Sequence, residues 1–233
     1  MLEVSGLSCG YGDIIAVRDL SFSVEAGRIL ALLGANGAGK TSTLMCLVGI
    51  VTRKAGRIML AGADITELPT EQRIRRGMAV VPEGRRIFPD LSVRENLAVG
   101  GHVISAAQLA EGTERVYDYF PRLRERRSQL AGSLSGGEQQ MLAMGRALIS
   151  GPKLILVDEL SLGLMPKVVD ECYAVLHKLK EAGVAIILVE QNTERALAAA
   201  DEVCVLEAGN LSWRGSASEA HQNENLVAAL LGQ

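Results

Sequence analysis

Residues 34–41 are the first group whose types and spacing could do chemistry, because glycines, a lysine and a threonine occur there at the spacing of a phosphate-binding loop. Glycines let the backbone curl so that successive N–H groups point at phosphate oxygens, and the N-terminus of a following helix adds partial positive charge. An aliphatic run, 28–33, enters the segment and a helical pattern leaves it. We expect Lys40 to contact the β- and γ-phosphates of a nucleotide and Thr41 to ligate Mg²⁺. The predicted phosphate-binding residues are Gly34, Asn36, Gly37, Ala38, Gly39, Lys40, Thr41 and Ser42.

Two adjacent acids, Asp158 and Glu159, stand at the end of the aliphatic run that begins at residue 154. A carboxylate in such a place can hold Mg²⁺ through water, and its neighbour can orient and deprotonate the water that attacks a phosphate. We therefore predict Asp158 as a metal residue and Glu159 as the general base. A strand capped by solvated carboxylates is the plain alternative, and the phosphate loop in the same chain disfavours it.

Ser135, Gly136 and Gly137 form a third group, directly before the helical run 138–150. A serine followed by glycines at a helix N-terminus is a further anion-binding arrangement. Taken alone, the group could be an ordinary N-cap with Ser135 as the capping residue. Two anion sites in one chain, far apart in the sequence, favour a more specific role.

The elements that must position these residues follow from periodicity. Five short aliphatic runs are typical of buried strands, and helical patterns separate several of them. The runs are 28–33, 78–81, 154–158, 185–189 and 203–206. Strands that alternate with helices predict a parallel sheet with right-handed crossovers. The helix predicted over 167–182 places on one face Val168, Cys172, Val175, Leu176 and Leu179.

Other segments have different patterns. Residues 4–12 and 14–27 alternate apolar and polar side chains, as an antiparallel sheet with one wet face does. Gly209 and Asn210 lie between two short β-like runs and predict a hairpin. The stretch from about 92 to 150 lacks a strand pattern and is predicted to be helical. These patterns indicate a mixed α/β core with a small β layer and one inserted helical lobe.

Composition limits the class of protein. The chain is 48 % hydrophobic but only 3 % aromatic, which suits aliphatic buried strands, and its net charge of −3 disfavours a nucleic-acid partner. No apolar run approaches the ~18–20 residues that span a bilayer, and the N-terminus lacks a signal-peptide pattern, so we expect a cytoplasmic chain. The cysteines are expected to be reduced and buried: Cys9, Cys46, Cys172 and Cys204.

The segment 134–140, which reads LSGGEQQ, resembles the signature sequence of ABC ATPases. The phosphate loop, this signature and the acidic pair occur in the order found in that family, and the resemblance covers essentially the whole chain. It implies an α/β fold with a P-loop NTPase (RecA-like) core, an N-terminal antiparallel β layer and an inserted helical lobe. It also implies one ABC ATP-binding domain over 1–233, with the core and β layer in 1–91 and 151–233 and the lobe in 92–150.

Further positions are assigned by the same resemblance. Tyr11 stands where the family stacks an aromatic ring on adenine, although a plain β-layer tyrosine is the alternative. Glu83 replaces the usual glutamine of the Q-loop, beside the nucleotide and the metal, and Gln191 replaces the catalytic switch histidine. Leu160 stands where proline is usual, which puts the rigidity of the following D-loop, 161–164, in doubt.

These departures narrow the resemblance to one ATPase subunit of branched-chain amino acid importers, with amide and urea importers as the close alternative. The resemblance implies ATP and Mg²⁺, a second ATPase subunit or a self-dimer, two permease subunits and, indirectly, a periplasmic or extracytoplasmic solute-binding protein. It places the chain on the inner face of the cell membrane. A soluble ABC protein of DNA repair or translation would carry long insertions or paired cassettes. A nucleotide sensor with weak hydrolysis is disfavoured by Glu159.

Overall fold

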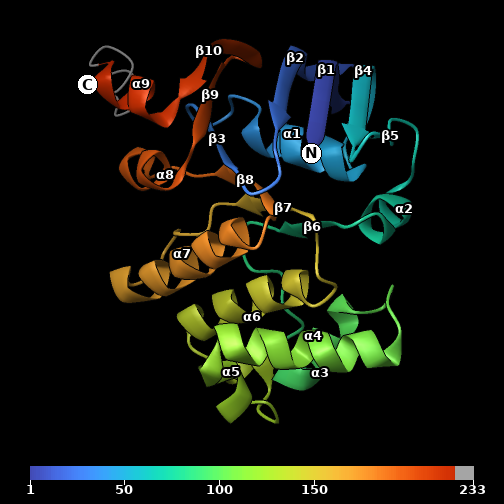
Figure 1. Ribbon diagram of the computed structural model, residues 1–233, viewed down its shortest axis with the longest axis vertical. Coiled ribbons are helices and arrows are strands. Elements are labelled where there is room, and N and C mark those ends of the chain that lie inside the picture. The colour runs from blue at the N-terminus through green and yellow to red at the C-terminus, as the bar shows by residue number, and fades with distance from the viewer. Residues whose placement is uncertain (224–233) are drawn as a thin grey trace.

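The computed structural model describes residues 1–223, which form two β-sheets with helices between and around them (Figure 1). The predicted domain runs to residue 233, so its last ten positions, 224–233, lie outside the described part. The strands are β1 (Leu2–Tyr11), β2 (Ile14–Val24), β3 (Ile29–Leu33), β4 (Thr52–Leu60), β5 (Ala63–Asp64), β6 (Met78–Val81), β7 (Leu154–Asp158), β8 (Ala185–Val189), β9 (Glu202–Glu207) and β10 (Asn210–Ser216). The helices are α1 (Lys40–Val48), α2 (Thr70–Arg75), α3 (Val93–Gly100), α4 (Ala106–Tyr119), α5 (Pro121–Glu125), the 3₁₀ helix η1 (Ala131–Ser133), α6 (Gly136–Leu148), α7 (Pro166–Glu181), α8 (Thr193–Ala199) and α9 (Ala217–Gln222).

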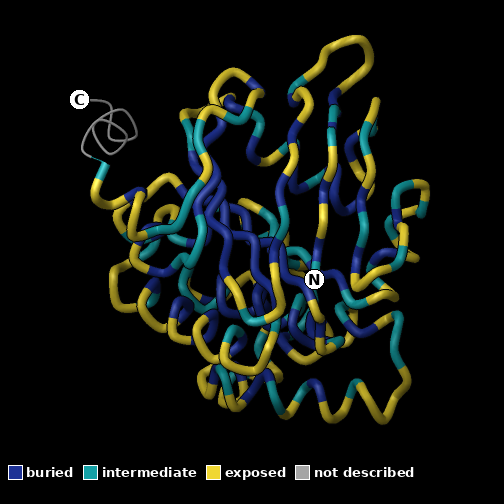
Figure 2. Tube along the Cα trace, turned by 45° about the horizontal axis from the view of Figure 1, so that its top comes forward, coloured by how far each residue is buried: buried dark blue, intermediate teal, exposed yellow. Residues whose placement is uncertain are grey.

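The larger sheet has six strands in the order β10-β9-β3-β8-β7-β6. All five predicted aliphatic runs are strands of this sheet, and they pair in parallel, as expected. Helices cover both faces, so every residue of β3, β7 and β8 is buried (Figure 2). Burial on two faces explains why these strands are continuous aliphatic runs rather than alternating ones.

The smaller sheet is antiparallel, with the order β2-β1-β4-β5. The pairing of β1 with β2 confirms the interpretation of the alternating N-terminal segments. The pairing of β1 with β4 was not foreseen. Basic residues interrupt the apolar pattern of β4, and only Ile58 and Leu60 of that strand are buried. A strand with so few buried positions has too weak a periodicity to be recognised from the sequence.

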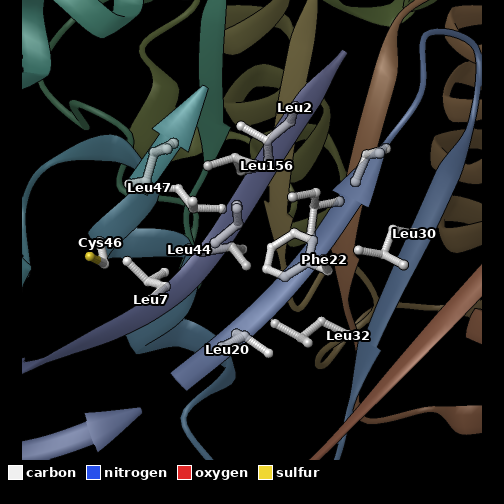
Figure 3. Close-up of a cluster of buried hydrophobic side chains, with 14 of the residues drawn as sticks. Leu2, Leu7, Leu20, Phe22, Leu30, Leu32, Leu44, Cys46, Leu47 and Leu156 are labelled. Carbon is white, nitrogen blue, oxygen red and sulfur yellow. The ribbon is translucent and has the colours of Figure 1, made fainter. Parts of the chain in front are cut away.

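Helix α1 lies between the two sheets, and its apolar face is the centre of the first core (Figure 3). Leu44 and Leu47 of α1 pack with Leu2 and Phe22 of the small sheet and with Leu156 of the large one. The helix that starts at the end of the phosphate loop is therefore fixed from both sides. This packing gives the loop a rigid support.

The second core joins the opposite face of the large sheet to α7 and to the helices of residues 93–148. All elements of that segment are helical, as predicted (Figure 1). The apolar face of α7 is displaced slightly from the prediction: Val168 is only partly buried, whereas Val169 and Tyr173 are buried. Val169 and Tyr173 share the buried face because they lie three residues before Cys172 and Leu176 on the helix.

The β9–β10 hairpin is present, but its turn consists of Ala208 and Gly209 rather than Gly209 and Asn210. The φ angles of Ala208 and Gly209 are 47° and 83°, and a two-residue type I′ turn requires both to be positive. The four cysteines are buried and free, as predicted. Among the helices of residues 1–223, none combines the length and the hydropathy of a membrane-crossing segment.

Candidate functional site

Four predicted site segments follow neighbouring parallel strands. The phosphate loop follows β3, Glu83 follows β6, Glu159 follows β7 and Gln191 follows β8. The carboxyl ends of parallel strands meet at one edge of a sheet, which is where open α/β sheets bind ligands. The topology therefore brings together residues that are far apart in the sequence.

The phosphate loop has the backbone that its glycines allow. Gly34, Gly37 and Gly39 have φ angles of 141°, 81° and 102°, which residues with a side chain rarely adopt. A Cβ atom on Gly39 would lie 2.8 Å from Cγ2 of Val17. Helix α1 starts at the next residue, Lys40, and no described side chain caps its N-terminus. Its first N–H groups are therefore available to an anion.

Lys40 lies over this loop and is only 6 % exposed. Its Nζ atom donates to the carbonyl oxygens of Gly34 at 2.7 Å and Ala35 at 3.0 Å. Burial lowers the pKa of Lys40, and the negative charges of Glu159 and Asp158 oppose that shift. The ammonium group thus lies against the backbone of the loop that leads to the uncapped N-terminus of α1.

Asp158 is buried behind the loop. The hydroxyl of Thr41 donates to its Oδ1 atom at 3.2 Å, whereas Oδ2 has no hydrogen-bond partner among the described residues. Burial raises the pKa of Asp158 to about 6, and the charges of Glu159 and Glu83 add to the shift. A hydroxyl and an unpartnered buried carboxylate oxygen are hard ligands of the kind that Mg²⁺ prefers. The residues present fit a magnesium ion.

Glu159 has a positive φ of 52°, a conformation that costs a non-glycine residue about 1–2 kcal/mol. Its backbone N–H donates to the carbonyl oxygen of Val189 at 2.9 Å. The side-chain amide of Gln191 donates to its Oε1 atom at 2.8 Å, and Oε2 has no partner within the part of the chain that the structure describes. The strained backbone and the amide contact together fix the direction of this carboxylate.

These groups face an open pocket of about 310 Å³. The structure brings the predicted Glu83, Glu159 and Gln191 together with most of the phosphate loop. One lining residue, Ala16 of β2, was not predicted, because a lone alanine in a strand carries no chemical signal. The lining residues are Ala16, Asn36, Gly37, Gly39, Lys40, Thr41, Ser42, Glu83, Glu159 and Gln191.

Several predicted residues lie outside this lining. Tyr11 is 55 % exposed at the end of β1, so its role in stacking on adenine stays a prediction. Gly34 contributes a carbonyl to Lys40, and Ala38 is buried beneath the loop. The group Ser135 to Gly137 lies at the N-terminus of α6, on a different part of the fold.

The N-terminus of α6 is a complete capping box. The Ser135 hydroxyl accepts from the backbone N–H of Glu138, and the Glu138 carboxylate accepts from the backbone N–H of Ser135 at 2.9 Å. Arg85 approaches from the loop after β6, and its Nη1 atom donates to Oε1 of Gln139 at 3.2 Å. A Cβ atom on Gly136 would lie 3.1 Å from the Arg85 guanidinium. Ser135 therefore acts as the N-cap of α6, and Gly136 leaves room for the Arg85 guanidinium.

Two contacts, one made by Arg85 and one by Glu190, were not predicted from the sequence. Arg85 follows Glu83 within a left-handed turn, in which Gly84, Arg85 and Arg86 all have positive φ. Its contact with Gln139 joins positions 54 residues apart and has no local signal. Glu190, at 2 % exposed, is a buried carboxylate that accepts from the backbone N–H and the hydroxyl of Ser161. A glutamate next to a strand end gives no hint of such burial.

Comparison with known proteins identifies similar chains over the full length. A family model described as ABC transporter matches residues 17–161. The chain is 44 % identical to the high-affinity branched-chain amino acid transport ATP-binding protein BraG of Pseudomonas aeruginosa, over 100 % of both chains. It is 34 % identical to the lipopolysaccharide export system ATP-binding protein LptB of Escherichia coli, over 100 % of this chain and 97 % of that one. A solved structure of the ATP-binding subunit of an ABC transporter is 26 % identical, with a TM-score of 0.87, over 100 % of this chain and 98 % of that chain.

Proposed function

The chain belongs to the ABC transporter family as an ATP-binding, ATP-hydrolysing subunit, and on this premise we propose that it powers the import of branched-chain amino acids. The observation that supports this cargo is the identity of 44 % with BraG over the full length, against 34 % with LptB, whose name describes export of lipopolysaccharide. The sequence VPEGRRIF over 81–88 and LVEQN over 188–192 support the same branch. The transported solute itself would contact other subunits.

The phosphates of ATP would lie on the loop between β3 and α1. The uncapped N-terminus of α1 would offer its first backbone N–H groups to the phosphates. Lys40 would exchange its contacts with the carbonyls of Gly34 and Ala35 for contacts with phosphate oxygens. Asn36 and Ser42 line the same pocket and can add polar contacts.

Thr41, Asp158 and Glu83 are the residues that would hold Mg²⁺. Bound there, the ion would neutralise negative charge on the phosphates. The Thr41 hydroxyl already bonds to Asp158, and the unpartnered Oδ2 atom of Asp158 is the further oxygen donor. Glu83 lines the pocket from the loop after β6 and adds a negative charge that the usual glutamine would not carry.

Hydrolysis requires a base beside the attacking water, and Glu159 has the geometry for it. Glu159 lines the pocket and accepts the amide of Gln191 at Oε1, so its carboxylate would be the group that accepts the proton of water. The left-handed backbone of Glu159 keeps this carboxylate at the pocket. Gln191 thus orients the base through an uncharged amide rather than through an imidazole ring.

A second ATPase subunit would complete the site. Ser135, Gly136 and Gly137 stand at the N-terminus of α6, apart from the pocket of the same chain, and suit the γ-phosphate bound by a partner. Between β7 and α7, Leu162 and Met165 are 51 % and 73 % exposed. Large exposed apolar side chains close to a site favour a subunit interface there.

In a heterodimer, the two composite sites would be unequal. Gln191 carries no charge and cannot exchange a ring proton as histidine does, and Glu83 adds negative charge near the metal. The site on this chain would therefore turn over more slowly than the site on a partner that has the histidine. Single-turnover hydrolysis with one phosphate-loop lysine disabled at a time tests this, because equal rates from the two sites would refute it.

Two permease subunits would dock on the helical lobe that we assign to residues 92–150. Phe88 is 44 % exposed, and the Arg146 guanidinium lies 5.2 Å from its ring centroid, so an apolar and a basic group are presented together. Arg85 and Arg86 lie in the same loop, directly after the pocket residue Glu83. A permease contact at this loop would be only a few residues from the nucleotide.

The proposal is tested with the assembled transporter reconstituted in vesicles. We expect uptake of labelled leucine, isoleucine and valine that needs ATP on the side of this subunit. Glu159→Gln should keep ATP binding and lower hydrolysis about 10²–10⁴-fold, the usual effect of losing a general base. Hydrolysis without uptake of these three amino acids would refute the cargo, and parental hydrolysis by Glu159→Gln would refute the base.

A further inference from the structure

The carboxylate of Glu190 is buried at the end of β8 and is directed at the segment that follows β7. It is 2 % exposed, and it accepts the backbone N–H of Ser161 at 3.1 Å and the Ser161 hydroxyl at 2.7 Å. Burial raises the pKa of Glu190, and the two bonds from Ser161 oppose the shift. Burying a carboxylate is unfavourable unless hydrogen bonds compensate for the lost water. Both carboxylate oxygens accept a bond from Ser161, and the Tyr173 side chain and the backbone of Gln191 also stabilise the charge.

Three consecutive residues at the end of β8 hold the segment that contains the base. The carbonyl of Val189 accepts the N–H of Glu159, Glu190 binds Ser161, and Gln191 bonds to the carboxylate of Glu159. Between the two backbone attachments lies Leu160, which is fully buried. The backbone is therefore held by hydrogen bonds at the N–H of Glu159 and at the N–H of Ser161.

These two hydrogen bonds hold a segment in which Glu159 has a strained backbone. A non-glycine residue at a φ of 52° persists only where the surroundings enforce it. Proline at position 160 would restrict the segment covalently, but this chain has leucine there, whose backbone is free to rotate. The enforcement must come from non-covalent contacts, and those on the C-terminal side of Glu159 are the burial of Leu160 and the bonds to Glu190.

Asp201, a partly buried carboxylate, shows how a structural anchor is built. Asp201 accepts the N–H of Ile29 at 2.9 Å, and it also pairs with Lys180 at 2.7 Å and Arg28 at 3.0 Å. Glu190 forms no ion pair with a basic residue within residues 1–223. Its nearest charged and polar surroundings include Tyr173 of α7, whose pKa is raised by burial and by the charge of Glu190. Glu190 is thus held by uncharged donors, whereas Asp201 is held by two cations.

We propose that Glu190 is a positioning residue for hydrolysis: its carboxylate fixes Ser161 and thereby holds Glu159 in the left-handed conformation that directs its side chain into the pocket. This inference rests on the proposed role of Glu159 as the base. It does not depend on the transported solute. Glu190 acts on turnover through the backbone of 159–161 and does not touch the nucleotide.

The test compares Glu190→Gln, Ser161→Ala and the matched control Asp201→Asn in the full-length chain within the assembled transporter. A base displaced by about 1 Å can lose about 10²-fold in rate. We expect Glu190→Gln to lower kcat about 10- to 100-fold, with the KM for ATP and the ATP affinity changed less than about twofold. Ser161→Ala keeps the backbone bond and should lose less. Ser161→Thr retains the hydroxyl and should retain most of the activity.

A double variant separates positioning from general loss of stability. If both residues act through one contact, Glu190→Gln combined with Ser161→Ala should lose much less than the product of the single losses. Asp201→Asn should lower the melting temperature and leave kcat close to the parental value. Parental kcat in both Glu190→Gln and Ser161→Ala would overturn the inference, as would an equal loss in Asp201→Asn. Parental hydrolysis without amino acid uptake would instead overturn the proposed cargo and leave this inference standing.

Discussion

The two glycine-containing helix N-termini of this protein are built in opposite ways. The N-terminus of α1 lacks a side-chain cap among the described residues, its loop glycines have positive φ, and the side chain of Lys40 lies above it. The N-terminus of α6 is closed by its own capping box, in which Ser135 and Glu138 bond reciprocally. One terminus leaves its donors for a ligand, and the other satisfies several of them itself.

The acidic residues near the two helix N-termini also differ in how their surroundings shift their pKa. At α1, a buried acid has its pKa raised to about 6, because Asp158 is desolvated and lies near Glu159 and Glu83. At α6, burial opposes but does not prevent a lowered pKa for Glu138, because hydrogen bonds from Ser135 stabilise its charge. The surroundings of Asp158 thus disfavour its negative charge, whereas the surroundings of Glu138 favour its charge. The difference supports our proposal that the first terminus binds nucleotide within the single chain, whereas the second acts on nucleotide bound by a partner.

The largest expected effect is the loss of ATP affinity in Lys40→Ala, compared with the matched change at the N-terminus of α6. Lys40→Ala removes a charged hydrogen-bond donor, which is worth about 1.5–3 kcal/mol, so the isolated chain should bind ATP about 10- to 100-fold more weakly. Ser135→Ala, the matched change at α6, should leave ATP affinity within about twofold. Equilibrium titration with a fluorescent ATP analogue measures both. Equal losses in the two variants would contradict the division of roles.

A somewhat smaller effect is expected from the pH dependence at Asp158. Its folded pKa of about 6 exceeds the ordinary value of 3.8, so the folded state binds more protons between these values and loses stability as pH rises through them. From about pH 5 to about pH 7.5, this group should remove about 1 kcal/mol from the unfolding free energy of the nucleotide-free chain. Asp158→Asn should lack this contribution and be more stable near neutral pH. Urea unfolding at the two pH values gives the difference, and an identical pH response in both proteins would refute it.

Loss of the N-cap at α6 is the next effect in size. Ser135→Ala should destabilise the chain by about 1 kcal/mol, the usual contribution of a serine cap, with the local unfolding concentrated at the start of α6. In the assembled pair it should also slow hydrolysis at the partner's site. Thermal unfolding combined with hydrogen exchange of the α6 amides measures the first part. A loss of stability confined to α1 would contradict it.

The smallest expected effect is the stability change of Glu138→Gln, which separates the charge of Glu138 from its role in the cap. Glu138→Gln retains an oxygen that can accept the N–H of Ser135, so the capping box should survive. Only the charge and its 2.6 Å ion pair with Arg126 are lost, and partly exposed pairs contribute about 0–1 kcal/mol. We expect a stability change below about 1 kcal/mol and no change in ATP affinity. A larger loss than in Ser135→Ala would show that the charge, and not the cap, maintains α6.

Local pattern was sufficient for much of the fold. The five aliphatic runs became β3, β6, β7, β8 and β9, because strands buried on both faces must be apolar throughout. Strand β4 was missed because its basic residues and few buried positions hide the alternation. The hairpin turn lies one residue earlier than predicted, because Ala208 and Gly209 are the two residues with positive φ.

The sequence by itself determined the chemistry of the site: the phosphate loop, the acids after β7, and the departures Glu83 and Gln191. The phosphate loop and the acids were predicted from residue type and local spacing, whereas Glu83 and Gln191 were assigned from the resemblance to ABC ATPases. Only the tertiary structure decided which side chains meet. The bonds from Gln191 to Glu159, from Ser161 to Glu190 and from Arg85 to Gln139 join positions 32, 29 and 54 residues apart. Such contacts depend on the order of strands in the sheet and on the packing of its loops, which no local pattern encodes.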